Sequence, residues 1–195
     1  MKAVKNHYFK KAKQEQYLAR SVYKLKEIDN RHRLTRKGIR VLDIGCSPGS
    51  WSQYLLERIG PGRVFGIDSA GAPKISDSRF TFIKTDIRSI DPVDLKSRVG
   101  TVDLLVSDAC PNTSGNKFMD GQRSIEIVRL VFYLSEALLA SGGSVVAKVL
   151  MGEDVGEFVQ NLGQDFEKVI LCKPKASRKE SRETFIVALH RRAGG

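Results

Sequence analysis

From Gly38 onward the chain alternates short apolar runs with stretches of helical character, and this alternation restricts the fold more than any other feature. Residues 102–106 and 145–149 are almost wholly apolar, as in strands whose sheet is covered on both faces. Strands that alternate with helices pair in parallel through right-handed crossovers. We therefore predict an α/β fold with a doubly wound, mostly parallel sheet. The predicted strands are residues 39–44, 63–68, 80–85, 102–108 and 144–150, and the predicted helices are residues 51–59 and about 124–140.

The two ends of the chain follow other patterns. A helix is predicted over residues 153–162 and strands over residues 166–173 and 184–190. The segment between these strands is too short for a helical crossover, so we predict a hairpin whose last strand runs antiparallel. Near the amino terminus, apolar residues recur at helical spacing over residues 15–32, which predicts an amphipathic helix with a basic outer face, outside the sheet.

Positive charge is concentrated at both ends of the chain, whose formal net charge is +11. Residues 1–40 hold 13 Lys or Arg against 3 acids, residues 41–172 hold 13 against 17, and residues 173–195 hold 7 against 2. Two basic ends on a mildly acidic body form a localised polyanion-binding surface if they meet in space, and we favour nucleic acid as the polyanion. For Lys10, Lys11 and Lys13 alone, a solvated and frayed tail is the alternative.

Length and composition favour one globular domain. With 195 residues, 41% of them hydrophobic and 28% charged, the chain is neither disordered nor fibrous in character. We expect a single domain over residues 1–195 with a basic helical extension over about residues 1–38. No apolar run approaches a membrane span, and the start lacks the apolar core of a secretory signal, so we expect a cytoplasmic monomer without membrane contact. Three scattered cysteines predict neither disulfides nor a zinc site.

A glycine-bearing turn, D-I-G-C-S-P-G over residues 43–49, joins the first predicted strand to the next helix. Ligands of open α/β sheets bind beyond the carboxyl ends of the strands, where glycine lets the backbone approach them. The absence of G-x-G-x-x-G and of G-x-x-x-x-G-K-[ST] argues against a Rossmann oxidoreductase and a nucleotide hydrolase. A cofactor without pyrophosphate needs neither pattern. Asp68 ends the second strand, where a carboxylate can bind both ribose hydroxyls of an adenosine, and Asp86 follows the third, where one can meet an adenine amine.

This turn resembles the S-adenosylmethionine loop of class I methyltransferases, and several segments together resemble the FtsJ/RrmJ-type ribose 2′-O-methyltransferases that act on RNA. The matching segments are residues 20–25 (RSVYKL), 43–51 (DIGCSPGSW), 107–112 (SDACPN), 147–149 (AKV) and 181–183 (SRE). The resemblance implies a Rossmann-like class I fold, with seven strands and an antiparallel last strand, and S-adenosyl-L-methionine as cofactor. It implies a catalytic set of Lys24, Asp108, Lys148 and Glu183. It places cofactor contacts at Gly45, Ser47, Pro48, Gly49, Trp51, Asp68, Asp86 and Asp108.

The chain departs from the family pattern at three places. Ser50 stands where members often have a second glycine, and Ala109-Cys110 stands where they have Met-Ala. Residues 69–73 match the pattern poorly, so the groups that hold the adenine edge stay open. Asp68 itself matches by position.

The four predicted catalytic residues suit methyl transfer to a hydroxyl. A ribose 2′-hydroxyl is a poor nucleophile at neutral pH, so the enzyme must align an in-line displacement and help to remove one proton. We take Lys148, at the end of a buried strand, as the group that takes or steers this proton. Burial and the charge of Lys24 would lower its pKa, whereas Asp108 and Glu183 would raise it, and the sequence leaves the balance open. Ordinary ion pairs at a sheet edge are the alternative.

Other methyl-transfer chemistries fit less well. Transfer to a base amine uses Asn or Asp before Pro-Pro and an aromatic residue, which D-A-C-P is not. Transfer to a pyrimidine carbon needs a cysteine nucleophile, usually after a proline, whereas Cys110 precedes Pro111. We therefore interpret Cys110 as a small apolar filler. Trp51 either stacks on the cofactor or a base, or packs in the core.

The resemblance also implies the substrate and partners. Compact family members without an appended RNA-binding domain act on large-subunit ribosomal RNA, which suggests a uridine of 23S-type RNA and, as partner, ribosomal RNA or the large ribosomal subunit. A transfer RNA or cap nucleotide is the alternative substrate. A non-catalytic RNA-binding assembly factor is the alternative function, which a missing member of the catalytic set would have favoured. The RNA contacts expected on the basic helix and on residues 173–182 are Arg20, Lys26, Arg31, Lys175 and Arg178.

Overall fold

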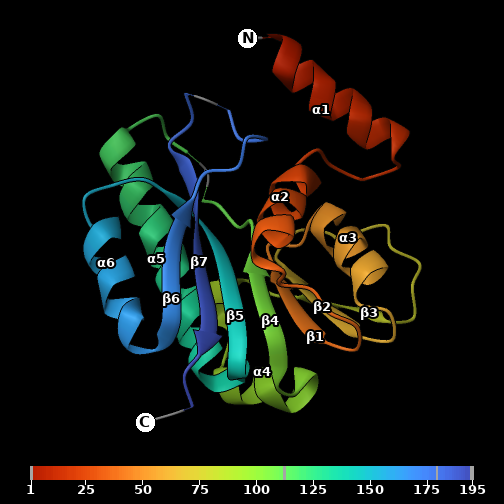
Figure 1. Ribbon diagram of the computed structural model, residues 1–195, viewed down its shortest axis with the longest axis vertical. Coiled ribbons are helices and arrows are strands. Elements are labelled where there is room, and N and C mark those ends of the chain that lie inside the picture. The colour runs from red at the N-terminus through yellow and green to blue at the C-terminus, as the bar shows by residue number, and fades with distance from the viewer. Residues whose placement is uncertain (1, 112, 179, 194–195) are drawn as a thin grey trace.

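The computed structural model describes residues 2–111, 113–178 and 180–193, so Asn112 of the SDACPN segment lies outside the described residues. Within this part of the chain, seven strands form one central sheet with helices over both faces (Figure 1). The strands are β1 (Arg40–Ile44), β2 (Arg63–Asp68), β3 (Phe80–Lys84), β4 (Val102–Ser107), β5 (Leu139–Leu150), β6 (Phe166–Cys172) and β7 (Glu183–Arg191). The helices are α1 (Lys2–Gln14), α2 (Val22–His32), α3 (Ser50–Arg58), α4 (Pro92–Val99), α5 (Lys117–Leu138) and α6 (Val155–Asn161), with 3-10 turns η1 (Ile87–Ser89) and η2 (Leu162–Gln164).

The strand order β3-β2-β1-β4-β5-β7-β6 confirms the predicted doubly wound sheet. Neighbours from β3 to β5 pair in parallel, whereas β7 pairs antiparallel with both β5 and β6. The predicted hairpin is therefore correct, but β7 inserts between β5 and β6, which the sequence did not indicate. Chain order reverses between β1 and β4, and in doubly wound sheets ligands bind at the carboxyl ends of such a pair.

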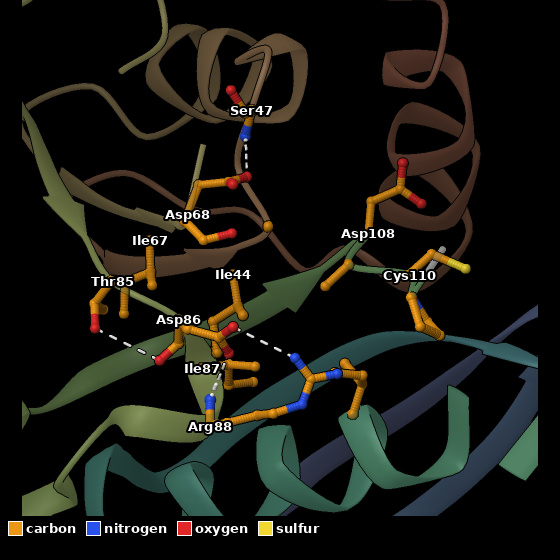
Figure 2. A pocket seen from close by; sticks show the side chains of 15 residues that line it. Ile44, Ser47, Ile67, Asp68, Thr85, Asp86, Ile87, Arg88, Asp108 and Cys110 are labelled. Atoms are coloured by element: carbon orange, nitrogen blue, oxygen red, sulfur yellow. Dashed lines mark hydrogen bonds and ion pairs between the residues drawn. The ribbon is translucent and has the colours of Figure 1, made fainter. Parts of the chain in front are cut away.

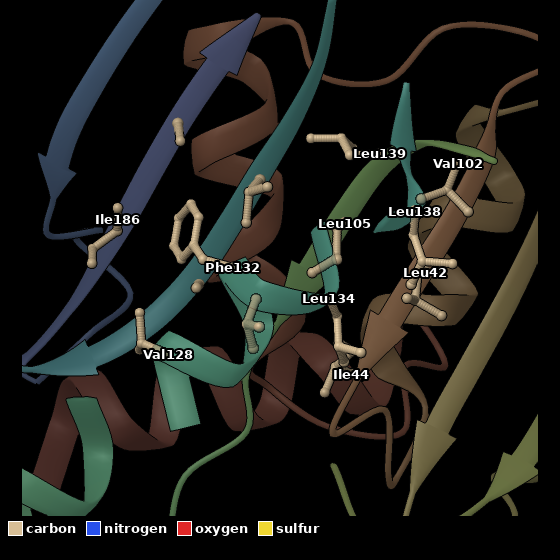
Figure 3. Packing of buried hydrophobic residues seen from close by; sticks show 14 of the residues in the cluster. Leu42, Ile44, Val102, Leu105, Val128, Phe132, Leu134, Leu138, Leu139 and Ile186 are labelled. Atoms are coloured by element: carbon tan, nitrogen blue, oxygen red, sulfur yellow. The ribbon is translucent and has the colours of Figure 1, made fainter. Parts of the chain in front are cut away.

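Two hydrophobic clusters, one on each face, hold the helices to the sheet. Successive residues of a strand point to opposite faces, so Val41 joins one cluster and Leu42 the other. On the Val41 face, Leu25 of α2 is fully buried among residues of α3 and the sheet. On the Leu42 face, Phe132 of α5 packs with Leu105 of β4 and its neighbours (Figure 3). Both faces are covered, as the nearly continuous apolar strands predicted.

The amino-terminal segment differs from the single helix predicted over residues 15–32. Helix α2 begins only at Val22, and a turn with Gln16 at φ 59° separates it from α1. Tyr17 lies in this turn and packs against the same cluster as α2, which is why its spacing resembled a longer helix. The hydroxyl of Tyr17 donates a 2.5 Å hydrogen bond to Glu57 of α3. Helix α1 lies at the periphery of the molecule (Figure 1).

Two further boundaries were wrong, and one helix was missed. Helix α5 starts at Lys117, before the predicted start near Ser124, because the side chain of Asn116 accepts the backbone N–H groups of Phe118 and Met119. Helix α4 was not predicted: it has few buried residues, although its cap, Asp91 followed by Pro92, was visible in the sequence. Strand β5 begins at Leu139, before the predicted start. No helix in the described ranges is long and apolar enough to cross a membrane.

Candidate active site

The turn after β1 brings backbone close to neighbouring segments at two glycines. Gly45 has φ 74°, and a Cβ atom there would lie 2.8 Å from Cα of Ala109, which follows β4. Gly49 has φ 116°, and a Cβ atom there would lie 2.7 Å from Cβ of Pro73. Both positions therefore require glycine for conformation and for space. The Ser47–Pro48 peptide bond between them is cis.

A cavity of about 330 Å³ opens beside this turn, at the carboxyl ends of the first four strands (Figure 2). Both polar and apolar side chains line it. The lining residues include Ile44 of β1 and Gly45 after it, Ile67 and Asp68 of β2, Thr85 to Arg88 after β3, and Asp108 to Pro111 after β4. The cavity lies at the reversal of strand order, and five of the predicted cofactor residues line it: Gly45, Ser47, Asp68, Asp86 and Asp108.

Asp68 is held in place by backbone donors. Its Oδ2 accepts a 2.9 Å hydrogen bond from N–H of Ser47, and its Oδ1 accepts one of 2.8 Å from N–H of Ala70 (Figure 2). The Ser47 hydroxyl in turn donates to the carbonyl of Gly71 at 3.0 Å. Residues 69–71, which matched the family pattern poorly, are thus tied to the turn after β1, and the carboxylate keeps lone pairs for a ligand.

Asp86 lies on the opposite wall of the cavity and caps the turn η1. Its Oδ1 accepts a 2.9 Å hydrogen bond from N–H of Arg88, and its Oδ2 lies 3.4 Å from the Arg88 guanidinium (Figure 2). Arg88 also lines the cavity, although no sequence signal pointed to it. The carboxylate of Asp86 is therefore paired with a cation, and at 44% exposure it stays accessible to a ligand.

The other predicted cofactor residues lie outside the main cavity. Trp51 is 3% exposed, its indole N–H donates to the carbonyl of Ser21 at 2.9 Å, and its ring packs against Phe185 with centroids 5.9 Å apart. Trp51 thus packs between α2, α3 and β7, one of the two roles expected for it, and it also lines a small recess beside the turn after β1. Pro48 lines only a small adjoining recess, and Gly49 lines neither hollow.

The four predicted catalytic residues come together from four separate elements. Lys24 lies on α2, Asp108 follows β4, Lys148 is on β5 and Glu183 begins β7. Nζ of Lys24 donates a 2.7 Å hydrogen bond to Oε2 of Glu183 and lies 3.7 Å from Oδ1 of Asp108. Nζ of Lys148 lies 3.0 Å from the same Oδ1 and donates to the Asp108 carbonyl at 2.5 Å. The four residues therefore lie in one cluster, as the prediction that they share a site requires.

Asp108 Oδ1 is the central atom of this cluster. It lies near two ammonium groups, yet it is buried and no described residue donates a well-oriented hydrogen bond to it. An ionised carboxylate oxygen left in this state retains a strong acceptor site. Asp108 also lines the large cavity, so the cluster and the cavity share one residue.

Two members of the cluster have shifted pKa values. Burial lowers the pKa of Lys148, but the negative charge of Asp108 and neighbouring groups outweighs burial, and the net direction is upward. Burial raises the pKa of Glu183, but the Lys24 ammonium and the hydroxyl of Ser177 outweigh it, and the net direction is downward. Lys148 is therefore a cation and Glu183 an anion near neutral pH, which resolves the balance that the sequence left open.

Comparison with known proteins identifies the family. A family model described as FtsJ-like methyltransferase matches residues 17–191. The chain belongs to the FtsJ-like methyltransferase family. The ribosomal RNA large subunit methyltransferase E of Nitratidesulfovibrio vulgaris (strain DP4) is 45% identical over 192 residues, which cover 97% of this chain and 94% of the relative. The protein of the same name from Brachyspira hyodysenteriae is 42% identical over 187 residues, which cover 95% of each chain.

Solved structures agree with this family. A protein from Plasmodium falciparum described as a ribosomal RNA methyltransferase superimposes with a TM-score of 0.79 at 30% identity, over 91% of this chain and 100% of that one. A protein from Streptococcus thermophilus described as a hemolysin has a TM-score of 0.67 at 17% identity, over 91% of this chain and 68% of that one. The second likeness shows the fold alone.

Two residues of this FtsJ-like site were missed or misread. The Ser177 hydroxyl, 6% exposed, donates a 2.7 Å hydrogen bond to Oε1 of Glu183, and no sequence pattern singled it out. Cys110 is exposed and lines the cavity, so its interpretation as an apolar filler was wrong. In the described ranges no three His, Cys, Asp or Glu side chains are grouped as a metal site would need.

The two basic segments of the FtsJ-like fold do meet. Oε2 of Glu27 on α2 accepts a 2.7 Å hydrogen bond from N–H of Lys175, and the Arg31 guanidinium contacts Sγ of Cys172 at 3.5 Å. Lys175 and Arg178 are exposed, and Arg20 is half-buried.

Lys26 is a different case from the other predicted RNA contacts. Its Nζ pairs with Glu15 at 3.1 Å and lies 4.2 Å from the ring centre of Tyr17, so it fastens the turn after α1. Lys26 is therefore half-buried and paired within the protein, and its predicted RNA contact stays a prediction.

Proposed function

We propose that the chain transfers a methyl group from S-adenosyl-L-methionine to a ribose 2′-hydroxyl of large-subunit ribosomal RNA, with a uridine of 23S-type RNA as the target nucleotide. The observation that carries this is the position of Asp108, which belongs both to the cavity wall and to the Lys-Asp-Lys-Glu cluster. A donor in the cavity and an acceptor at the cluster would meet there. The names of the relatives support ribosomal RNA of the large subunit as substrate.

The cavity fits the proposed cofactor in its chemistry. Carboxylates at the ends of β2 and β3, Asp68 and Asp86, suit the ribose hydroxyls and the adenine amine of an adenosine. Apolar walls at Ile67 and Ile87 suit the faces of a purine, and Gly45 lets backbone approach a ligand. When bound, S-adenosyl-L-methionine supplies an activated methyl group.

The cluster supplies what the acceptor hydroxyl needs. The Lys148 ammonium has three donors; one bonds the Asp108 carbonyl, which leaves N–H groups to hold a hydroxyl oxygen. Oδ1 of Asp108 is buried between the ammonium groups of Lys148 and Lys24, so it fixes their positions beside the acceptor. Lys24 pairs with both Glu183 and Asp108, so it holds the Asp108 carboxylate in place and balances its charge. Because Lys148 is protonated at rest, it orients the hydroxyl oxygen as a donor, and the hydroxyl proton leaves to water or to the Asp108 carboxylate as the methyl group is transferred.

The RNA surface in this proposal consists of Arg20, Arg31, Lys175 and Arg178, named here the basic rim. It joins α2 and residues 173–182 beside the cluster, and its cations would bind phosphates without reading sequence. The proposed substrate also implies a cytoplasmic location.

The decisive experiment is mass-spectrometric mapping of ribose methylation. Large ribosomal subunits and naked 23S-type RNA from cells lacking this protein would be incubated with the purified enzyme and labelled S-adenosyl-L-methionine. One new 2′-O-methyl nucleotide in ribosomal RNA is expected. Label found only in transfer RNA or capped RNA would show that one of these RNAs is the substrate instead. RNA binding without any label would favour the non-catalytic assembly factor.

A further inference from the structure

The segment between β6 and β7, residues 173–182, holds one buried hydroxyl against the catalytic cluster. Ser177 is 6% exposed and, together with the buried Ala176, lies between the exposed Lys175 and Arg178. Its Oγ donates a 2.7 Å hydrogen bond to Oε1 of Glu183. The segment itself is anchored, since N–H of Lys175 donates to Glu27 on α2 and N–H of Glu183 donates to Oγ of Ser181 at 3.1 Å.

The carboxylate of Glu183 is thereby held at both oxygens. Lys24 donates to Oε2 and Ser177 donates to Oε1, each at 2.7 Å. A glutamate side chain has three rotatable bonds, and two donors on separate oxygens restrict it far more than one does. Since Lys24 also lies 3.7 Å from Asp108, the orientation of Glu183 affects the position of Asp108 through Lys24.

We propose that Ser177 is a positioning residue for methyl transfer, which acts by fixing the Glu183 carboxylate and, through it, Lys24. The expected effect on catalysis rests on the proposed function, whereas the expected effect on the Glu183 carboxylate does not. Ser177 does not line the cavity, so its loss leaves the proposed cofactor walls intact.

The charged groups around Glu183 give the direction of the expected change. Lys24 of α2 and Lys148 of β5 face it as cations, and Asp108 lies beyond Lys24 as an anion. The Ser177 hydroxyl bonds the ionised form, so its removal must raise the pKa of Glu183. If catalysis needs ionised Glu183, the acid limb of the rate profile then moves to higher pH.

The first test measures Glu183 directly in the protein without cofactor. Side-chain carboxyl ¹³C shifts of labelled glutamate would be followed against pH in the wild type and in Ser177→Ala, with Glu183→Gln used for assignment. The Ser177→Ala variant should titrate at higher pH. Ser181→Ala is the matched control, because its hydroxyl meets the backbone of Glu183 and not the carboxylate, and it should leave this pKa unchanged. An unshifted pKa in folded Ser177→Ala would overturn the proposal.

The second test measures catalysis. Ser177→Ala should lower kcat about 10-fold with little change in the Kd of S-adenosyl-L-methionine, as expected for losing one hydrogen bond to a carboxylate. Ser177→Thr, which keeps the hydroxyl, should recover most of the rate. In a Glu183→Ala background the Ser177→Ala change should have no further effect, since its partner is gone. An additional loss there would show that Ser177 acts by another route.

These results separate the two proposals. If the wild type methylates ribosomal RNA but Ser177→Ala is as fast, the positioning role is wrong and the proposed function stands. If the wild type methylates no RNA, the proposed function fails, and the carboxyl titration still decides whether Ser177 holds Glu183.

Discussion

Lys24 and Glu183 are 159 positions apart in the chain, yet Nζ of the lysine donates a 2.7 Å hydrogen bond to a carboxylate oxygen of the glutamate. The pair joins α2, near the amino terminus, to the start of the last strand. Both side chains are largely buried, with exposures of 12% and 15%. A buried pair of this kind leaves an uncompensated charge when one partner is lost, so the cluster responds as a unit.

Lys148→Ala should lower the single-turnover rate of methyl transfer by at least about 100-fold, the low end of what proton transfer and alignment contribute. The Kd of S-adenosyl-L-methionine should stay nearly unchanged, because Lys148 is not among the residues that line the cavity. Lys148→Arg should fail almost as badly, because a planar guanidinium cannot reproduce the contacts of the buried ammonium with the carbonyl and the carboxylate of Asp108. Single-turnover assays with labelled cofactor, with calorimetry for binding, test this. A near-normal rate for the arginine variant would limit Lys148 to electrostatic positioning.

Asp68→Ala should weaken the binding of S-adenosyl-L-methionine by roughly 10- to 100-fold, the effect of losing hydrogen bonds to a charged group. It should also loosen the turn after β1, since Ser47 and Ala70 both donate to this carboxylate. Asp94→Ala on α4 is the control, as its carboxylate is 69% exposed and away from the cavity. Calorimetric titration decides the matter, and equal affinities for the two variants would remove Asp68 from the site.

Neutralising the basic rim should weaken RNA binding and flatten its salt dependence. The variant replaces Arg20, Arg31, Lys175 and Arg178 by glutamine, and each lost phosphate contact should reduce the slope of log K against log salt by about 0.7 to 0.9. The matched control replaces four exposed cations elsewhere, Lys37, Arg63, Lys96 and Arg98. Affinities for ribosomal RNA fragments across a salt series provide the measurement. Equal losses in both variants would show that charge number matters and not the rim.

Asp43 should make the unfolding free energy fall as pH rises. Burial raises its pKa to about 7, whereas the unfolded chain titrates near 3.9. Between these values the folded state holds a proton that the unfolded state lacks, so stability is highest below pH 4 for this group and falls by a few kcal/mol toward pH 7. Urea unfolding without cofactor at several pH values should show this loss in the wild type relative to Asp43→Asn. Parallel curves for the two proteins between pH 5 and 7 would contradict it.

Much of the fold could be predicted because its signals are local. Strand and helix periods, the glycine turn and the short connection before the last strand each depend on neighbouring residues, and the sheet they indicated is the one observed. The position of β7 between β5 and β6 could not be predicted from local signals, because it depends on which strand edges remain free once the sheet forms. Predicted helix boundaries were wrong where a local pattern was misleading. The spacing of Tyr17, for example, fits the helical pattern of α2, although Tyr17 lies in the turn before it.

The sequence by itself determined the alternating pattern of strands and helices, the glycines that the turn after β1 requires, and, through its resemblance to a family, the four residues proposed as catalytic. Only the tertiary structure decided what each of them touches. Trp51 packs beneath α2, Lys26 is held by Glu15, and Ser177 reaches Glu183. The raised pKa of Lys148 likewise results from burial opposed by charges on other elements. Periodicity and turn chemistry are properties of neighbouring residues, whereas a contact or a pKa sums over segments that only the folded chain brings together.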